Sequence, residues 1–131
     1  MQKRFSHIAR YVSDLQKSLV FYESILLPER IPDPFKDDHH AWLSMGDGLQ
    51  LHLIGGMDIS GNKHRRNHIC FAVQDLDRFM DFLVQKQVVF VDSKNQPGSF
   101  SVRGDGIRQI YFQDPDGYWI EANDEPVENE K

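Results

Sequence analysis

The chain has 131 residues and a mass of 15.3 kDa, enough for one domain with a substantial core and too few for two full-sized domains. A net charge of −5 and a pI of about 5.6 give no general basic surface, which argues against nucleic acid as a partner. No apolar run approaches the roughly 20 residues of a membrane helix, so we expect neither membrane association nor secretion. Cys70 is the single cysteine, which excludes an internal disulfide and favours the cytoplasm.

The sequence repeats itself at an offset of 61 positions. Between residues 7 and 21, six of fifteen pairs are identical at this offset, where roughly one match would arise by chance. The ends of the two halves also correspond, because Gly48 precedes His52 by four residues as Gly117 precedes Glu121. His52 and Glu121 are therefore equivalent positions.

In chain order, each half predicts the element sequence βαβββ. In the first half we expect a strand at 5–12, a helix with an apolar stripe, a weak strand near 29–35 that prolines interrupt, and strands at 42–45 and 49–54. In the second half we expect a strand at 67–73, a second helix, and strands at 88–92, 107–112 and 118–123. Asp14 and Asp75 suit the N-caps of the two helices, and Asp114 to Gly117 form a turn.

The predicted organisation is one α+β domain over residues 1–123 made of two tandem βαβββ modules. Module 1 covers about 1–56, module 2 covers about 66–123, and residues 55–67 link them. The acidic segment at 124–131 is typical of a disordered tail.

Alternation along the strands separates an apolar face from a polar one. The apolar face carries Ile8, Val12, Leu49, Leu51, Leu53, Ile69, Phe71, Val73, Tyr118, Ile120 and Ala122, with Arg10 as its exception. The opposite face carries His7, His52, His68 and Glu121 at matching places of the two repeats, beside the small residues Ala9, Cys70 and Ala72. Three imidazoles and one carboxylate suit a divalent ion such as Zn, Ni, Fe(II), Mn or Co.

Each of these residues also has a structural interpretation. A lone strand histidine is ordinarily structural, but four groups at symmetry-related places, one of them a carboxylate among apolar neighbours, favour metal binding. The candidates for lining the pocket are Trp42, Gln50, Gln109 and Tyr111, of which Trp42 and Tyr111 suit the core equally well. Cys70 is interpreted as a small buried residue, and His39, His40 and His64 as surface residues in loops.

Three segments resemble the vicinal oxygen chelate superfamily, which includes glyoxalase I, bleomycin-resistance proteins, fosfomycin-resistance enzymes and extradiol dioxygenases. They are HIARYVSDLQKSLVFYESIL, NHICFAVQDLDRFMDFL and IYFQDPDGYWIEA. The resemblance implies paired βαβββ modules that form a U-shaped cleft, and one divalent ion held by His7, His68 and Glu121. It also implies a homodimer, and a small-molecule substrate that chelates the metal through two adjacent oxygens. The site is completed either within one chain or by exchange of modules between two chains.

Glyoxalase I is the nearest relative in size, and it has a glutamate where this sequence has His52. His52 is therefore either a fourth metal ligand or an acid/base beside the metal, and Glu121 serves as ligand and base. Methylmalonyl-CoA epimerase has Gln near this position, which keeps Gln50 as a second candidate. We predict a metal-dependent lyase or isomerase of the glyoxalase type, with Zn or Ni favoured.

Three alternatives remain open. His7, His68 and Glu121 are also the ligand set of an Fe(II) dioxygenase of the extradiol type. A fosfomycin-type thiol transferase, for which Mn is the expected metal, ranks lower because the sequence has no obvious potassium-binding loop. The alternative outside enzymes is a drug-binding or metabolite-binding protein of the bleomycin-resistance type, although such proteins generally lack the metal ligands.

Overall fold

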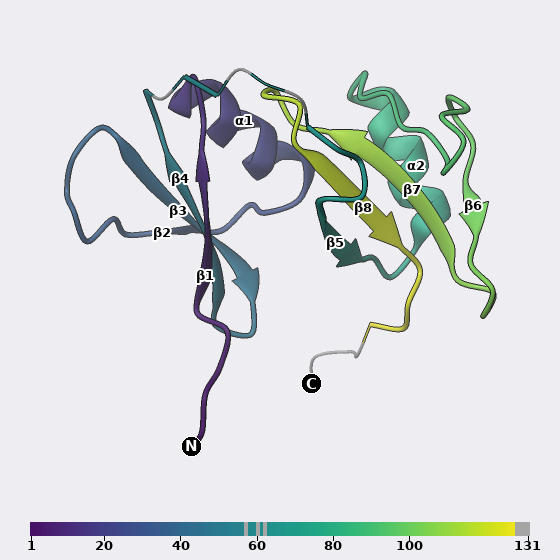
Figure 1. The fold of residues 1–131 in the computed structure, drawn as a ribbon, viewed down its shortest axis with the longest axis horizontal. Coiled ribbons are helices and arrows are strands. Elements are labelled where there is room, and N and C mark those ends of the chain that lie inside the picture. The colour runs from purple at the N-terminus through teal and green to yellow at the C-terminus, as the bar shows by residue number, and fades with distance from the viewer. Residues whose placement is uncertain (57, 60, 62, 128–131) are drawn as a thin grey trace. The chain divides into compact units, whose positions relative to one another are not determined.

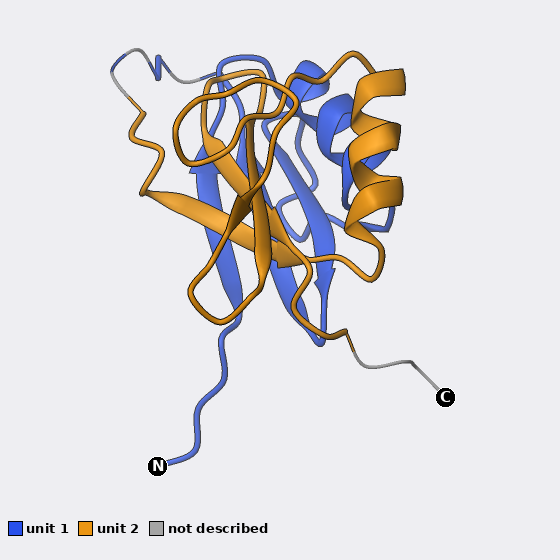
Figure 2. Ribbon diagram, turned by 90° about the vertical axis from the view of Figure 1, so that its right-hand side faces the viewer, with its two compact units in different colours: residues 1–61 blue, residues 62–131 orange. Residues whose placement is uncertain are grey.

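A computed structural model describes residues 1–56, 58, 59, 61 and 63–127. The chain divides into two compact units, Met1–Gly61 and Asn62–Lys131 (Figure 2). The boundary falls inside the predicted linker at 55–67. That residues 1–123 act as one domain stays a prediction.

Unit 1 contains one helix and a four-stranded mixed sheet. Its elements are β1 (His7–Tyr11), α1 (Leu15–Ile25), β2 (Arg30–Ile31), β3 (His40–Gly46) and β4 (Leu49–Ile54) (Figure 1). The strand order is β1-β4-β3-β2, with β1 parallel to β4 and the other pairs antiparallel. The weak strand predicted near 29–35 is only the two residues of β2.

Unit 2 repeats this topology. Its elements are β5 (His68–Ala72), α2 (Leu76–Gln85), β6 (Ser101–Val102), β7 (Arg108–Gln113) and β8 (Trp119–Asn123). The strand order is β5-β8-β7-β6, again with one parallel pair, β5 and β8. The predicted α+β class and the doubled βαβββ unit are confirmed.

The strand predicted at 88–92 is wrong. Within this run only Val91 makes β-bridges, to Pro97 and Tyr111, and the second strand of the unit is β6 instead. The reason lies in Asp92, whose Oδ1 accepts hydrogen bonds from the amides of Lys94 (2.8 Å) and Gln96 (2.9 Å). These bonds favour a turn at Asp92, which ends the extended run.

Both helices begin where the sequence predicts. Asp14 accepts a hydrogen bond from the Lys17 amide at 3.1 Å, and Asp75 accepts one from the Arg78 amide at 3.0 Å. At the end of β4, a Cβ on Gly55 would lie 2.7 Å from Leu15 Cβ, so only glycine permits this close approach to α1. None of the described helices is long and apolar enough to cross a membrane.

The predicted apolar face supplies much of the core. Val12, Leu51, Leu53 and Ala122 are fully inaccessible, and Ile120 is 1% exposed. The Asp114 turn is also confirmed: Asp114 Oδ1 accepts from the amides of Asp116 (2.9 Å) and Tyr118 (3.0 Å). It directs the chain into β8, the strand that carries Glu121.

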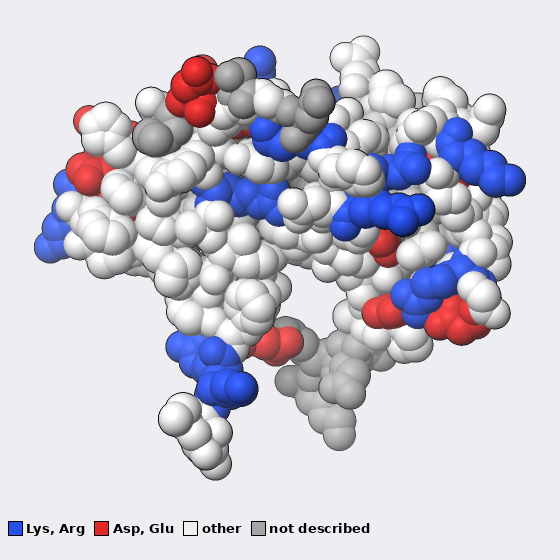
Figure 3. Space-filling view, viewed as in Figure 1, with Lys and Arg blue, Asp and Glu red and all other residues white. Residues whose placement is uncertain are grey.

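Acidic and basic side chains are interspersed on the face shown in Figure 3. In unit 2, Arg103 pairs with Glu125 at 2.9 Å, and Arg108 pairs with Asp124 at 2.9 Å and with Asp77 at 2.8 Å. Asp124 and Glu125, the first two residues of the segment predicted to be a disordered tail, hold ion pairs, and that the segment is disordered stays a prediction. Residues 128–131 of that tail lie outside the described residues.

Candidate metal centre

The ladder between β1 and β4 brings His7 and His52 onto one face of unit 1. The parallel register pairs His7 with Gln50 and Ala9 with His52, and the two imidazole centroids are 6.1 Å apart. His7 is exposed, and its Nδ1 lies 3.1 Å from the Ser6 hydroxyl. His52 is only 6% exposed. One ring is therefore accessible to a ligand, and the other is enclosed by protein.

Aromatic rings enclose His52. The Trp42 indole stacks on it with centroids 3.8 Å apart and planes 8° apart, and the Phe35 ring stacks at 5.8 Å. The Nε2 atom of His52 lies 2.7 Å from Nδ1 of His40, a hydrogen-bond distance. Burial, followed by the charges of His40 and His7, lowers the pKa of His52 from its ordinary value. His52 is therefore neutral near pH 7.

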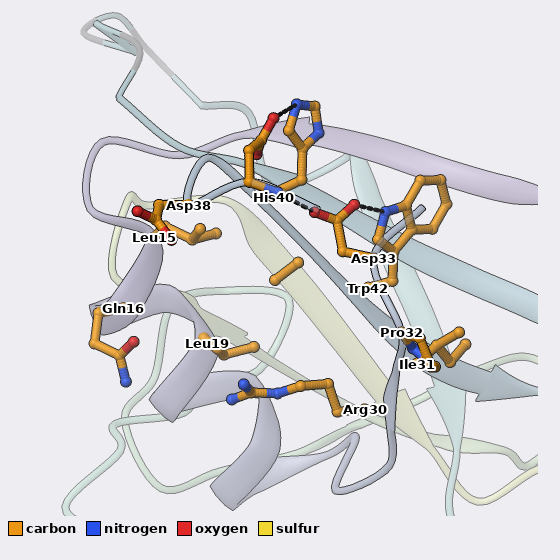
Figure 4. A pocket seen from close by; sticks show the side chains of 12 residues that line it. Leu15, Gln16, Leu19, Arg30, Ile31, Pro32, Asp33, Asp38, His40 and Trp42 are labelled. Atoms are coloured by element: carbon orange, nitrogen blue, oxygen red, sulfur yellow. Dashed lines mark hydrogen bonds and ion pairs between the residues drawn. The ribbon is translucent and has the colours of Figure 1, made fainter. Parts of the chain in front are cut away.

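The segment between β2 and β3 holds this aromatic group in place. Asp33 Oδ1 accepts a hydrogen bond from the Phe35 amide at 3.0 Å. It also accepts one from the Trp42 indole at 3.3 Å (Figure 4). The same segment and the start of α1 border a pocket of about 710 Å³. Of the predicted pocket residues of this unit, Trp42 contacts His52, and Gln50 is half-buried on the face that carries His7 and His52.

In unit 2, the register of β5 and β8 brings His68 and Glu121 together. His68 Nδ1 lies 2.7 Å from the Arg65 carbonyl oxygen and donates its proton there, because a carbonyl only accepts. In a neutral imidazole, Nε2 then carries a lone pair, and this Nε2 lies 3.1 Å from Glu121 Oε1. A lone pair facing a carboxylate oxygen is repulsive, so this contact requires either a proton shared between the two atoms or a metal cation that binds both. The donor set fits a divalent cation.

Neutral donors surround the other oxygen of Glu121, a residue that is 5% exposed. Oε2 accepts hydrogen bonds from the Gln109 amide (3.1 Å), the Cys70 thiol (3.2 Å) and the Asn123 amide (3.4 Å). None of these donors carries a positive charge, so the carboxylate keeps its attraction for a cation at Oε1.

Two side chains beside Glu121 have raised pKa values. Burial, then the hydrogen bond to Glu121 and its negative charge, raises the pKa of the Cys70 thiol to about 12. The interpretation of Cys70 as a small buried residue is wrong, because the residue as a whole is exposed and only its thiol, which points at Glu121, is partly buried. Burial and the charge of Glu121 also raise the pKa of Tyr111, whose ring edge meets His68 at 5.7 Å.

The predicted site residues therefore form two pairs, His7 with His52 in unit 1 and His68 with Glu121 in unit 2. Within the residues that the structure describes, no cluster of three or more His, Cys, Asp or Glu side chains forms a metal site. That the two pairs share one ion stays a prediction.

The contribution of His40 was not predicted. This residue was expected in a surface loop, but it lies in β3 and is half-buried against His52. Strand alternation contained the signal, because His40 and Trp42 are two residues apart and share a face. Phe35 and Asp37 are in an irregular segment, where no periodicity indicates contact with a strand. Asn123 lies on the predicted polar face, but without an assigned role.

Comparison with known proteins identifies the family. Residues 4–122 match the model of the Glyoxalase/Bleomycin resistance protein/Dioxygenase superfamily, so the chain belongs to that superfamily. It is 31% identical over 120 residues to the metallothiol transferase FosB of Lysinibacillus sphaericus, covering 88% of this chain and 78% of the relative.

Solved structures of the family share the fold. The fosfomycin resistance protein FosX of Listeria monocytogenes superimposes with a TM-score of 0.76 at 24% identity, covering 97% of this chain and 94% of that one. A glyoxalase/dioxygenase of Nostoc punctiforme superimposes with a TM-score of 0.74 at 26% identity, covering 95% and 92%. The relatives thus include enzymes named for different reactions, and the reaction must be inferred from the site.

Proposed function

We propose that the protein is a divalent-metal enzyme of the glyoxalase type, a lyase or isomerase that acts on a small molecule chelating the metal through adjacent oxygens. His7, His68 and Glu121 hold the ion, for which Zn or Ni is expected. The observation that carries this proposal is the 3.1 Å approach of His68 Nε2 to Glu121 Oε1. Two histidines and a carboxylate leave coordination positions open for a chelating substrate.

When bound, the ion supplies positive charge beside two substrate oxygens, which lowers the free energy of negative charge developing there. Glu121 Oε2 accepts hydrogen bonds from Gln109, Cys70 and Asn123, which leaves Oε1 to face the ion. Family membership supports the combination of this pair with His7, which occupies in β1 the position that His68 occupies in β5.

His52 is the proposed acid/base. Because it is neutral, it accepts a proton from a substrate carbon next to a carbonyl, and the C–H electron pair moves toward the carbonyl oxygen. Return of the proton to the neighbouring carbon, with transfer of the hydroxyl proton from one oxygen to the other, completes an isomerisation that needs no oxidant or reductant. Glu121 is the second candidate base, as both ligand and proton carrier. Trp42, Gln50 and Tyr111 are proposed to contact the substrate.

Thiol transfer is the second candidate reaction, and the 31% identity to a metallothiol transferase favours it. In this reaction a thiol sulfur bonds to an electrophilic carbon of the substrate, the carbon–oxygen bond breaks, and the thiol proton goes to the leaving oxygen.

Metal content tests the site. We expect about one equivalent of divalent metal in the protein purified anaerobically, by elemental analysis, and its loss in a His7→Ala, Glu121→Ala double variant. A His39→Ala variant is the matched control, because His39 is exposed and should leave the metal content unchanged. Wild-type protein without metal, even after reconstitution, would leave a metal-free binding protein as the function.

Three parallel assays then separate the reactions. Incorporation of deuterium from heavy water into an α-hydroxycarbonyl probe reports isomerase chemistry, loss of thiol in the presence of an epoxide reports thiol transfer, and oxygen uptake with a catechol reports dioxygenation. A metal-loaded protein that does none of these, but binds the probes, would contradict the enzyme proposal. Sedimentation at twice 15.3 kDa would support the homodimer expected in this family.

A further inference from the structure

The hydrogen bond between His40 and His52 has a direction that determines which nitrogen of His52 is available. His40 Nδ1 and His52 Nε2 are 2.7 Å apart, so one of them carries the shared proton. Both rings are shielded: Trp42 stacks on His52 at 3.8 Å, Phe35 stacks on His40 at 4.3 Å, and His52 is only 6% exposed. Little water can compete for the shared proton in this enclosed position.

The charge of Asp37 favours one direction of the hydrogen bond between His40 and His52. Its Oδ2 lies 3.8 Å from His40 Nε2, too far for a direct hydrogen bond but close enough for its negative charge to favour a proton on that nitrogen. Asp37 is itself held, because its amide donates to Asp33 Oδ2 at 3.2 Å and its Oδ1 accepts from the His39 amide at 2.9 Å. A neutral His40 with the proton on Nε2 has a lone pair on Nδ1.

We propose that Asp37 and His40 are positioning residues that fix His52 as the tautomer with its proton on Nε2. His52 Nε2 donates to His40 Nδ1, and Nδ1 of His52 is the acceptor nitrogen. Any proton transfer or metal contact by His52 therefore uses Nδ1, whereas His68 presents Nε2. The tautomer follows from unit 1 alone, while the use of Nδ1 in catalysis rests on the proposed function.

The test is NMR of the metal-free, fully ¹⁵N-labelled protein, which needs neither substrate nor turnover. We expect the one-bond N–H coupling on His52 Nε2 and a second coupling, through the hydrogen bond, between that nitrogen and His40 Nδ1. In His40→Ala the coupling through the hydrogen bond disappears, and the Nε2 proton exchanges faster with water. His39→Ala, one residue away and exposed, should retain both signals.

Two further variants separate the parts of the proposal. Asp37→Asn keeps the size of an exposed side chain and removes its charge, so a fraction of the shared proton should move to His40 Nδ1. His40→Asn places an amide near the position of Nδ1, and should restore part of the slow exchange that His40→Ala loses. A wild-type proton on His40 Nδ1, or no coupling between the rings, would overturn the proposal. An unchanged proton position in Asp37→Asn would overturn the part assigned to Asp37.

Kinetics distinguish failure of this inference from failure of the proposed function. If His52 is the base, His40→Ala should lower kcat by about tenfold with KM nearly unchanged, as is typical for loss of a hydrogen bond that orients an active imidazole. His40→Ala should have no further effect in a His52→Ala background. If His52→Ala keeps full activity, the acid/base role in the proposed function is wrong, although the tautomer measured by NMR stands.

Discussion

The two units have the same topology, but they hold their key side chains in different ways. In unit 2, a backbone carbonyl fixes His68, and its Nε2 faces a carboxylate at 3.1 Å. In unit 1, aromatic rings enclose His52, and its Nε2 shares a hydrogen bond with the His40 imidazole at 2.7 Å. The equivalent positions of Glu121 and His52 therefore hold a carboxylate that faces an imidazole in one unit and a buried imidazole that is hydrogen-bonded to a second one in the other.

The cores of the two units also differ, in the size of the side chain that follows His52 and Glu121 along the strand. Leu53 in β4 and Ala122 in β8 directly follow His52 and Glu121, and both are fully inaccessible. The repeat keeps the direction of each side chain but not its volume, so the packing around the two sites is specific to each unit. Substitutions at matched positions can test how far the two units are interchangeable.

The largest expected effect is on this packing. Leu53→Ala should lower the free energy of unfolding by about 2–5 kcal/mol, because it leaves a cavity in the core. The reciprocal Ala122→Leu should cost about 1–3 kcal/mol through overpacking. Urea denaturation measures both, and Val20→Ala, on an exposed part of α1, should change stability by less than about 0.5 kcal/mol. Tolerance of both core changes would show that the two cores are interchangeable.

The second prediction concerns Cys70, whose counterpart in unit 1 is Ala9. With a pKa of about 12, the thiol should react with alkylating reagents at pH 8 roughly a thousandfold more slowly than a thiol at the ordinary value of 9.0, because only the thiolate reacts. Glu121→Gln removes the nearby negative charge, lowers the pKa and should accelerate the reaction. Mass spectrometry of the alkylated protein gives the rate, with glutathione in the same tube as a reference. Equal rates for the two thiols would mean that Cys70 does not feel the Glu121 carboxylate.

A smaller effect, similar in the two units, is expected at the helix caps. Asp14→Ala and Asp75→Ala should each cost about 1 kcal/mol of unfolding free energy, because each removes one hydrogen bond to an otherwise unsatisfied amide. Replacement by asparagine, which also caps helices, should restore most of the loss. A cost confined to one of the two variants would show that the repeat is only approximate at the helix starts.

Much of the fold could be predicted because it depends on local signals that occur twice. The caps at Asp14 and Asp75, the turn at Asp114 and the alternation of Leu51 and Leu53 each constrain their own neighbourhood. The strand expected at 88–92 was wrong because side-chain hydrogen bonds of Asp92 compete with strand pairing, and apolar content does not reveal them.

The strand face on which each candidate residue lies could be predicted from the sequence, but the contacts of these residues could not. Alternation placed His52 and Glu121 on the polar face, because it depends only on the backbone. The hydrogen bond between His40 and His52 and the stacking of Phe35 depend on the course of the irregular segment between β2 and β3. That course is set by hydrogen bonds to Asp33, which no periodic pattern encodes.

The smallest expected effect is a pH dependence of stability that arises in unit 1. Burial lowers the pKa of His52 in the folded protein below its ordinary value of 6.5. As the pH falls through that value, the unfolded chain takes up a proton that the folded protein still resists, so the free energy of unfolding decreases. The decrease ends when the pH reaches the lowered pKa of His52 in the folded protein.

We therefore expect metal-free wild-type protein to lose more stability between pH 7.5 and pH 5.5 than a His52→Gln variant, measured by urea denaturation with a chelator present. His39→Gln, at an exposed histidine, should keep the wild-type slope. Identical slopes for wild type and His52→Gln would show that the folded protein accepts a proton on His52 as readily as the unfolded chain, and would remove the basis for a neutral acid/base at this position.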